Sequence, residues 1–232
     1  MTLSPENIHY TYNAVVNLIS EGYEEIFLNC IFEEGWNWNH AHILYNELIK
    51  LADYIIDNKY NETVYVAMFN EDYFVPLGKE DNTNWCGGTS DNMLTITPDG
   101  KYSTCLRFLA SSLNNEQPEL TFGSVQQGFL VTEQDKKNRQ ILDNITRISQ
   151  STDECLNCSI AKGCSWCSGY NYQKTGSPNK RVTYSCCMHK ARALANVYYW
   201  NKIYSLYNID NQFSIELLPE EIQLIIGGTE NG

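Results

Sequence analysis

The chain has 232 residues, 43% of them hydrophobic, and carries a formal net charge of -12. This length and hydrophobic content predict one large or two small globular domains and exclude a disordered chain. A nucleic-acid partner needs a basic face, which 16 Lys and Arg against 28 Asp and Glu do not provide. No apolar run is long enough to cross a bilayer and no secretory signal opens the sequence, so we expect a cytoplasmic protein without a membrane partner.

The first part of the chain alternates between helix and strand patterns. Ser4, Pro5 and Glu6 are typical of a helix start, and apolar residues follow at helical spacing up to Gly22. The patterns of a buried strand, a helix and a second buried strand come next, over residues 25–32, 42–57 and 64–69. This order is typical of parallel α/β architecture, but two strands leave open sheet edges. We therefore expect residues 1–75 to be the end of a larger α/β domain whose earlier part is missing.

The middle of the chain has a hairpin pattern. Residues 93–97 and 102–106 have strand character and flank Pro98-Asp99-Gly100-Lys101, which predicts a turn between two strands. Little regular structure is expected over residues 155–172. Helices are expected over three further segments: residues 136–148, residues 188–207 and a last one starting near Pro219. The predicted domains after the first are thus an α+β, cysteine-rich domain over residues 76–190 and a C-terminal helical segment over residues 191–232.

Nine cysteines are the most informative feature of the sequence. Because nothing indicates export and an odd number pairs badly, clustered cysteines here indicate thiolates that bind a metal. Cys30 stands alone on a predicted buried strand and is expected to be a core thiol. The other eight follow the order C-x13-G-x4-C, then C-x2-C-x5-C-x2-C, then an adjacent pair: Cys86 and Cys105; Cys155, Cys158, Cys164 and Cys167; Cys186 and Cys187.

The spacing alone leaves two kinds of metal site open. A structural zinc ion needs two cysteine pairs, and the four cysteines from Cys155 to Cys167 supply them. A single zinc site would leave four other cysteines without a role: Cys86, Cys105, Cys186 and Cys187. Iron–sulfur clusters are held by cysteine thiolates too. The residues alone therefore favour a zinc site and an iron–sulfur site about equally.

The cysteine order from Cys86 to Cys187 resembles the SPASM domain of radical SAM peptide-modifying enzymes. The preceding helix and strand pattern resembles the last part of a radical SAM partial (β/α) barrel, and the two together cover most of the chain. The phrases LSPENI, EEGW and CCMHKARALANVYYW resemble the maturases whose targets are CXXX-repeat peptides. One spacing departs from the family: its last pair is C-x3-C, whereas Cys164 and Cys167 are separated by two residues. The fold that the resemblance implies is α/β, a barrel remnant followed by an α+β SPASM-type domain.

The resemblance implies two auxiliary [4Fe–4S] clusters. The first would be held by three cysteines, with an open iron or a fourth thiolate: Cys86, Cys105 and Cys167. The second would be held by four: Cys155, Cys158, Cys164 and Cys187. Cys187 is preferred to Cys186 because the Met-His-Lys that follows it matches the family's closing helix, and Cys186 is the alternative ligand or a spare. Asn29 would face S-adenosylmethionine in the complete enzyme.

The radical-generating cluster of this superfamily needs a C-x3-C-x2-C motif, which the sequence does not contain. The resemblance therefore implies the C-terminal part of a radical SAM enzyme that modifies a ribosomally synthesised peptide, for example by a thioether crosslink. Its partners would be the precursor peptide and a missing N-terminal portion with a third [4Fe–4S] cluster and S-adenosylmethionine, and this chain alone is not expected to turn over. Two alternatives stay open: a non-catalytic binding module stabilised by zinc, and a relative of the sulfatase-maturating enzymes.

Overall fold

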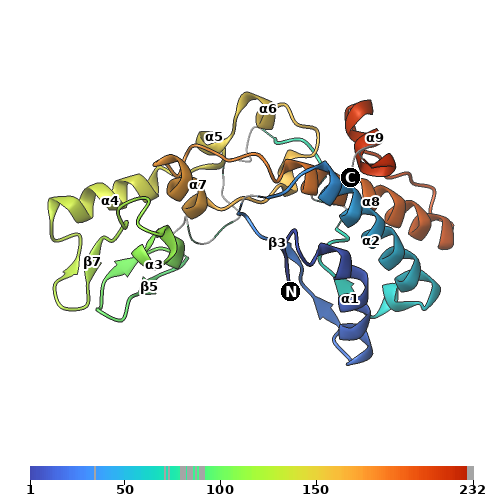
Figure 1. Cartoon of the computed structure of the whole chain (residues 1–232), viewed down its shortest axis with the longest axis horizontal. Helices are drawn as coiled ribbons and strands as arrows, with labels where there is room; N and C mark the ends of the chain where they lie inside the picture. The colour runs from blue at the N-terminus through green and yellow to red at the C-terminus, as the bar shows by residue number, and fades with distance from the viewer. Residues whose placement is uncertain are drawn as a thin grey trace. The chain divides into compact units, whose positions relative to one another are not determined.

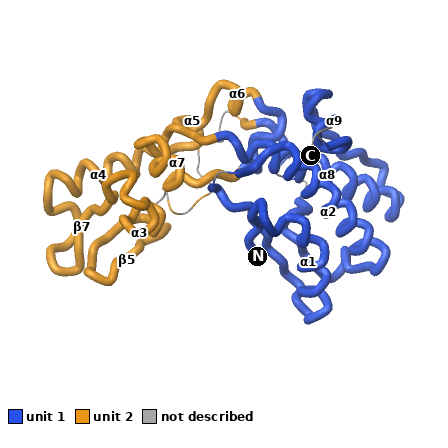
Figure 2. The backbone as a smooth tube through the Cα atoms, in the orientation of Figure 1, with its two compact units in different colours: residues 1–76, 158–164, 183–232 blue, residues 77–157, 165–182 orange. Residues whose placement is uncertain are grey.

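The computed structural model describes residues 1–33, 35–70, 72, 74–78, 82, 86, 88 and 92–228. These residues form a mixed α/β structure of helices and short strands (Figure 1). The chain divides into two compact units, which Figure 2 shows in different colours. Unit 1 consists of residues 1–76, 158–164 and 183–232, and unit 2 of residues 77–157 and 165–182.

The strands of unit 1 pair in parallel. They are β1 (Thr2–Leu3), β2 (Glu25–Ile26), β3 (Asn29–Cys30) and β4 (Tyr65–Val66). Thr2 of β1 lies opposite Asn29 of β3, and Glu25 of β2 lies opposite Tyr65 of β4. Along the segment over residues 25–30, β2 pairs in parallel with β4, and β3 pairs in parallel with β1. Parallel pairing is what the alternation of helices and strands predicts. Strand β1 was not predicted, because two residues are too few to show a strand pattern.

Unit 1 also contains the helices α1 (Thr11–Ser20), α2 (Trp38–Asp57), α8 (Cys186–Leu206) and α9 (Pro219–Gly227), and α9 packs on α2. Short 3-10 turns, η1 (Ile8–Tyr10), η2 (Tyr60–Glu62) and η6 (Ala161–Gly163), complete the unit. The predicted helix start at Ser4 is wrong. The Ser4 amide donates to the Asn7 side chain at 2.8 Å, and this local turn delays the helix until Thr11.

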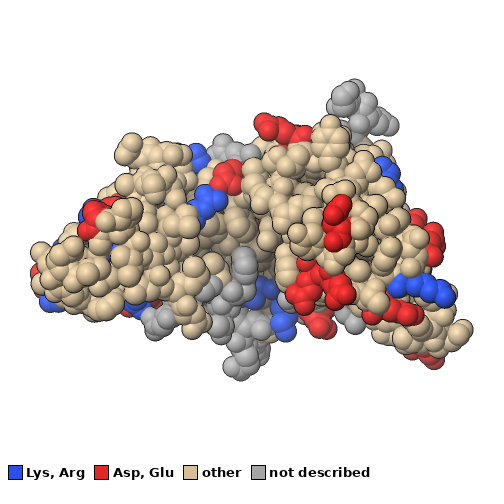
Figure 3. All heavy atoms as spheres, turned by 90° about the horizontal axis from the view of Figure 1, so that it is seen from below, with Lys and Arg blue, Asp and Glu red and all other residues tan. Residues whose placement is uncertain are grey.

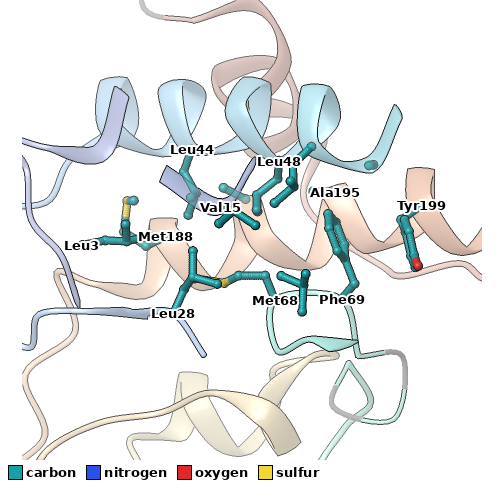
Figure 4. Packing of buried hydrophobic residues seen from close by; sticks show 14 of the residues in the cluster. Leu3, Val15, Leu28, Leu44, Leu48, Met68, Phe69, Met188, Ala195 and Tyr199 are labelled. Carbon is teal, nitrogen blue, oxygen red and sulfur yellow. The ribbon is translucent and has the colours of Figure 1, made fainter. Parts of the chain in front are cut away.

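The core of unit 1 lies between α2, α8 and the strands. In Figure 4, Leu44 and Leu48 of α2 point toward the helix that carries Met188 and Ala195, and Met68 lies nearby. Leu48 is fully buried; burying a leucine side chain contributes about 1.5–3 kcal/mol.

Helix α8 also forms hydrogen bonds with the residues directly after β4. Arg192 Nε and Asn196 Nδ2 both donate to the Met68 carbonyl, at 3.0 and 2.8 Å. The C-terminal residues from 183 onward therefore pack with residues 1–76 in one unit.

Unit 2 is built around two antiparallel hairpins. The strands are β5 (Thr95–Ile96) with β6 (Tyr102–Ser103), and β7 (Gly123–Ser124) with β8 (Gly128–Phe129). The first hairpin confirms the predicted turn: the Gly100 amide donates to the Thr97 carbonyl at 2.8 Å, and Gly100 has a φ of 83°. A bridge between Lys101 and Ser124 joins the two hairpins.

The remaining elements of unit 2 are short: η5 (Leu106–Phe108), α3 (Ala110–Leu113), α4 (Glu133–Asp143), α5 (Arg147–Gln150), α6 (Asp153–Leu156) and α7 (Ser168–Thr175). The expected helix over 136–148 is two helices, and the first begins earlier because Thr132 and Asp135 form a capping box. The cysteine-rich stretch over 155–172 was expected to be irregular, yet it contains turns of helix. The apolar core of unit 2 includes Phe108, Leu113 and Tyr172. Among the described residues, no helix is long and apolar enough to span a membrane.

Candidate metal centre

The thiols of Cys86 and Cys105 lie close together in unit 2. A Cβ atom added to Gly88 would lie 3.4 Å from Cys105 Sγ and 3.5 Å from Cys86 Sγ. Both sulfurs therefore approach the same point beside Gly88. The added Cβ atom would touch both sulfurs at ordinary contact distance and would be tight only against Cys105 Cβ, at 3.0 Å.

Cys167 completes this group from a distant part of the sequence. It is the residue before α7, and the Tyr170 amide donates to its sulfur at 3.4 Å. A Cβ atom added to Gly169 would lie 2.4 Å from Arg107 Cβ, so the backbone after Cys167 packs closely on the segment after Cys105. Cys105 thus lies near both Cys86 and Cys167 within one unit, and these are the three cysteines predicted to hold the first cluster.

The surroundings of these thiols act on their pKa values in both directions. Burial raises the pKa of Cys167, and the Tyr170 amide and the Arg107 charge lower it less than burial raises it. Burial also raises the pKa of Cys86, with a backbone hydrogen bond at Gly88 opposing it. Cys105 raises the pKa of both neighbours, because two thiolates close together repel. Metal binding at these residues therefore has to displace protons.

The donor set suits an iron–sulfur cluster in its chemistry. Cysteine thiolates are the usual ligands of such clusters, and hydrogen bonds to sulfur, such as the one from Tyr170, tune them. Within the part of the chain that the structure describes, no group of three or more His, Cys, Asp or Glu side chains is arranged as a ready metal-ion site.

The second predicted ligand set is divided between the two units. Cys155 lies on α6 in unit 2, where the Thr152 hydroxyl donates to its sulfur at 3.2 Å. Cys158 and Cys164 lie in unit 1, on either side of η6. Cys158 packs beside the small apolar cluster of Phe74, Ile160 and Ala193. Cys186 and Cys187 begin α8, also in unit 1.

The two adjacent cysteines of α8 have different surroundings. Cys187 is buried in the core of unit 1, donates to the Tyr184 carbonyl at 3.5 Å, and has a pKa raised to about 11 by burial. Cys30 packs against the same core, as predicted, and its pKa is raised to about 12 by burial and, to a smaller extent, by Cys187. Cys186 is half-buried and belongs to none of the apolar clusters of the described residues. Cys186 is thus the less buried of the two, and the choice between them as ligand stays a prediction.

The remaining predicted residue is Asn29. Its side chain is exposed on β3, and its backbone amide donates to the Met1 carbonyl at 3.2 Å. Its role toward S-adenosylmethionine stays a prediction.

Two residues with a direct effect on the centre were not predicted, Gly88 and Gly169. Each follows a cysteine by two positions, in the pattern C-x-G at Cys86 and at Cys167. That repeated pattern is the signal in the sequence that points to them, but the need for glycine arises from segments that are distant along the chain.

The sequence matches no model of a known protein family and no curated protein. The cysteine side chains and their surroundings therefore carry the functional assignment.

Proposed function

We propose that this chain is the auxiliary-cluster part of a radical SAM enzyme that modifies a ribosomally synthesised peptide. The observation that carries the proposal is that Cys105 lies near both Cys86 and Cys167 in unit 2. These three are distant in the sequence, and they are the cysteines that the SPASM resemblance assigns to one cluster. A chance distribution of core thiols would have no reason to bring that set together.

The proposed ligands follow from the resemblance and from burial. The first [4Fe–4S] cluster takes the three cysteines of unit 2. The second takes four cysteines: Cys155, Cys158, Cys164 and Cys186, the last in place of Cys187. When bound, the clusters would relay electrons or bind substrate, and the protein would place them and tune them through burial and hydrogen bonds to sulfur.

In this proposal, unit 1 is the end of a radical SAM partial barrel, and its parallel strands support that role. A further N-terminal portion would supply the third [4Fe–4S] cluster and S-adenosylmethionine, with Asn29 facing the latter. The precursor peptide would be the substrate of the complete enzyme only. A cytoplasmic location fits the proposal, because free thiolates persist in a reducing compartment.

The first test is the content of iron, sulfide and zinc after anaerobic purification and reconstitution. About eight iron and eight sulfide per chain are expected from two cubane clusters. One or two zinc ions without iron would overturn the proposal and favour the zinc-stabilised binding module.

A matched pair of variants assigns the first cluster. Cys105→Ser is expected to remove about four iron per chain, one cubane cluster, because it deletes a ligand thiolate. Cys30→Ser is the control, since Cys30 is a core thiol outside the proposed ligand sets. Equal iron content in the two variants would refute the assignment of Cys105.

A further inference from the structure

Unit 1 contains a cavity of about 500 Å³ next to β4, and no cysteine is among the described residues that line it. Its walls come from the start of β2, from η2 and β4, from the residues after β4, and from the second half of α8. All of these segments belong to unit 1. The cavity is therefore a feature of one compact unit, separate from the proposed cluster ligands.

One wall of the cavity is aromatic. Phe69 and Tyr199 stack with ring centroids 4.3 Å apart, and the Trp200 ring meets Tyr199 edge-on at 5.3 Å. Phe69 and Tyr199 are 5% and 7% exposed, so their rings are held in place by the surrounding core. Trp200, which is partly exposed, is the ring of this wall that a ligand can reach.

The cavity is also acidic, because four carboxylates line it: Glu24, Glu25, Glu62 and Asp72. Glu62 is oriented by the Tyr207 hydroxyl, which donates to its carboxylate at 2.8 Å. No Lys, Arg or His is among the described residues that line the cavity. Figure 3 shows that acidic side chains also gather on the visible face of the part of the molecule that unit 1 forms.

An unsatisfied acceptor adds an independent observation. Asn61 lines the cavity, and its amide nitrogen donates to the Tyr207 hydroxyl at 2.9 Å. Its amide oxygen is buried and has no hydrogen-bond partner among the described residues. A buried acceptor without a donor is unfavourable, so a ligand that brings N–H groups would gain from this position.

We propose that this cavity binds a guanidinium group, such as that of an arginine side chain. A planar guanidinium stacks on aromatic rings, pairs with carboxylates and presents several N–H donors at once. The cavity offers a counterpart to each property: the partly exposed ring of Trp200 for stacking, four carboxylates for ion pairs, and the oxygen of Asn61 as an acceptor. An anion would be repelled by the carboxylates.

The test follows the indole N–H signal of Trp200 in ¹H–¹⁵N NMR spectra of the full chain. The signal is identified as the one that Trp200→Phe removes. The probe is N-acetyl-L-arginine N-methylamide, added up to roughly 20 mM, since contacts of this kind give affinities near the millimolar range. A saturable shift of the Trp200 signal is expected. No shift, or an equal shift with the neutral isostere N-acetyl-L-citrulline N-methylamide, would overturn the proposal.

A pair of double variants with equal change of charge tests the site itself. Glu24→Gln with Glu25→Gln is expected to weaken binding roughly threefold to tenfold, the effect of two exposed ion pairs. Asp210→Asn with Glu216→Gln is the control, because both acids are exposed in unit 1 and neither lines the cavity. Equal affinity in the two double variants would contradict the proposal.

Two further comparisons complete the test. Free arginine binding more tightly than the capped probe would assign a free amino acid, and the reverse order a guanidinium on a peptide; both support the site. Iron measured in the same samples separates this inference from the cluster assignment, because none of these variants touches a cysteine.

Discussion

At the scale of single residues, two glycines set how closely the thiols of unit 2 approach one another. Gly169 lets the backbone after Cys167 lie against Arg107, and Gly88 leaves space next to the sulfurs of Cys86 and Cys105. Neither position has the positive φ that commonly selects glycine. Glycine is needed here because a side chain would occupy space that the neighbouring segment already fills.

Gly169→Ala is expected to lower the free energy of unfolding by roughly 1–3 kcal/mol, the range for overpacking a filled site. The added methyl group would stand 2.4 Å from Arg107 Cβ, so the two segments must separate. Iron bound after reconstitution should fall in the same variant. Urea denaturation and iron analysis measure the two effects. Gly227→Ala is the control, since nothing lies within 4 Å of its Cβ position; equal behaviour of the two variants would show that the close approach is unimportant.

The two cysteines at the start of α8 give a second prediction. Cys186→Ser is expected to lose about four iron per chain, because it removes a ligand of one cubane cluster. Cys187→Ala is expected to keep its iron but to lower the free energy of unfolding by about 1 kcal/mol, because it deletes a buried core thiol. Iron analysis and thermal unfolding of both variants decide the matter. Loss of iron only in the Cys187 variant would restore the ligand that the sequence favoured.

At the scale of elements, α2 and α8 are linked by a three-residue polar contact. Asp53 Oδ1 accepts hydrogen bonds from Lys202 Nζ and from the Tyr198 hydroxyl, each at 2.6 Å. Burial raises the pKa of Asp53, but the hydrogen bonds from Lys202 and Tyr198 together outweigh it and leave the pKa below its usual value. The hydrogen bond to Asp53 raises the pKa of Lys202 in turn.

Asp53→Asn should therefore reduce stability in a pH-dependent way. A carboxyl whose pKa is lower in the folded state stabilises the fold above its unfolded pKa, about 3.9, and this contribution is lost as pH falls below that value. We expect a loss of roughly 0.5–1 kcal/mol at pH 7, since the pair is partly exposed, and a smaller difference from the wild type near pH 3. Urea denaturation at both pH values measures it.

Asp57→Asn is the matched control on the same helix. Asp57 is exposed at the C-terminal end of α2. A negative charge there opposes the helix dipole, so its removal should have little effect or stabilise slightly. A loss of stability in the Asp53 variant that does not change between pH 7 and pH 3 would show that the ion pair is not its source.

At the scale of the whole molecule, each unit has its own apolar core. The residues of every apolar cluster come from a single unit. The chain nevertheless passes from one unit to the other after residues 76, 157, 164 and 182. The units are therefore separate in packing but interleaved in sequence.

Leu48→Ala and Leu113→Ala test this division. Each leucine is fully buried, Leu48 in unit 1 and Leu113 in unit 2, so each substitution should cost about 2–5 kcal/mol. Hydrogen exchange followed by mass spectrometry should show faster exchange mainly in the unit that carries the substitution. Equal acceleration in both units for either variant would mean that the chain unfolds as one cooperative body.

The sequence by itself determined the elements whose signals are local. The apolar stripes predicted α2 and α8, and Pro98-Asp99-Gly100 predicted the first hairpin of unit 2. The isolated Cys30 was correctly predicted to be a core thiol. Such signals need only the neighbouring residues, because helix periodicity, turn conformation and a buried strand are all read over a few positions.

Only the tertiary structure decided which distant segments meet. It paired Thr2–Leu3 with β3, packed the C-terminal helices with residues 1–76, and placed Cys187 in a core beside Cys30. It also showed that Gly169 must be small. A periodic pattern shows that a face is buried but not what covers it, because packing partners are selected by the shape of the whole core.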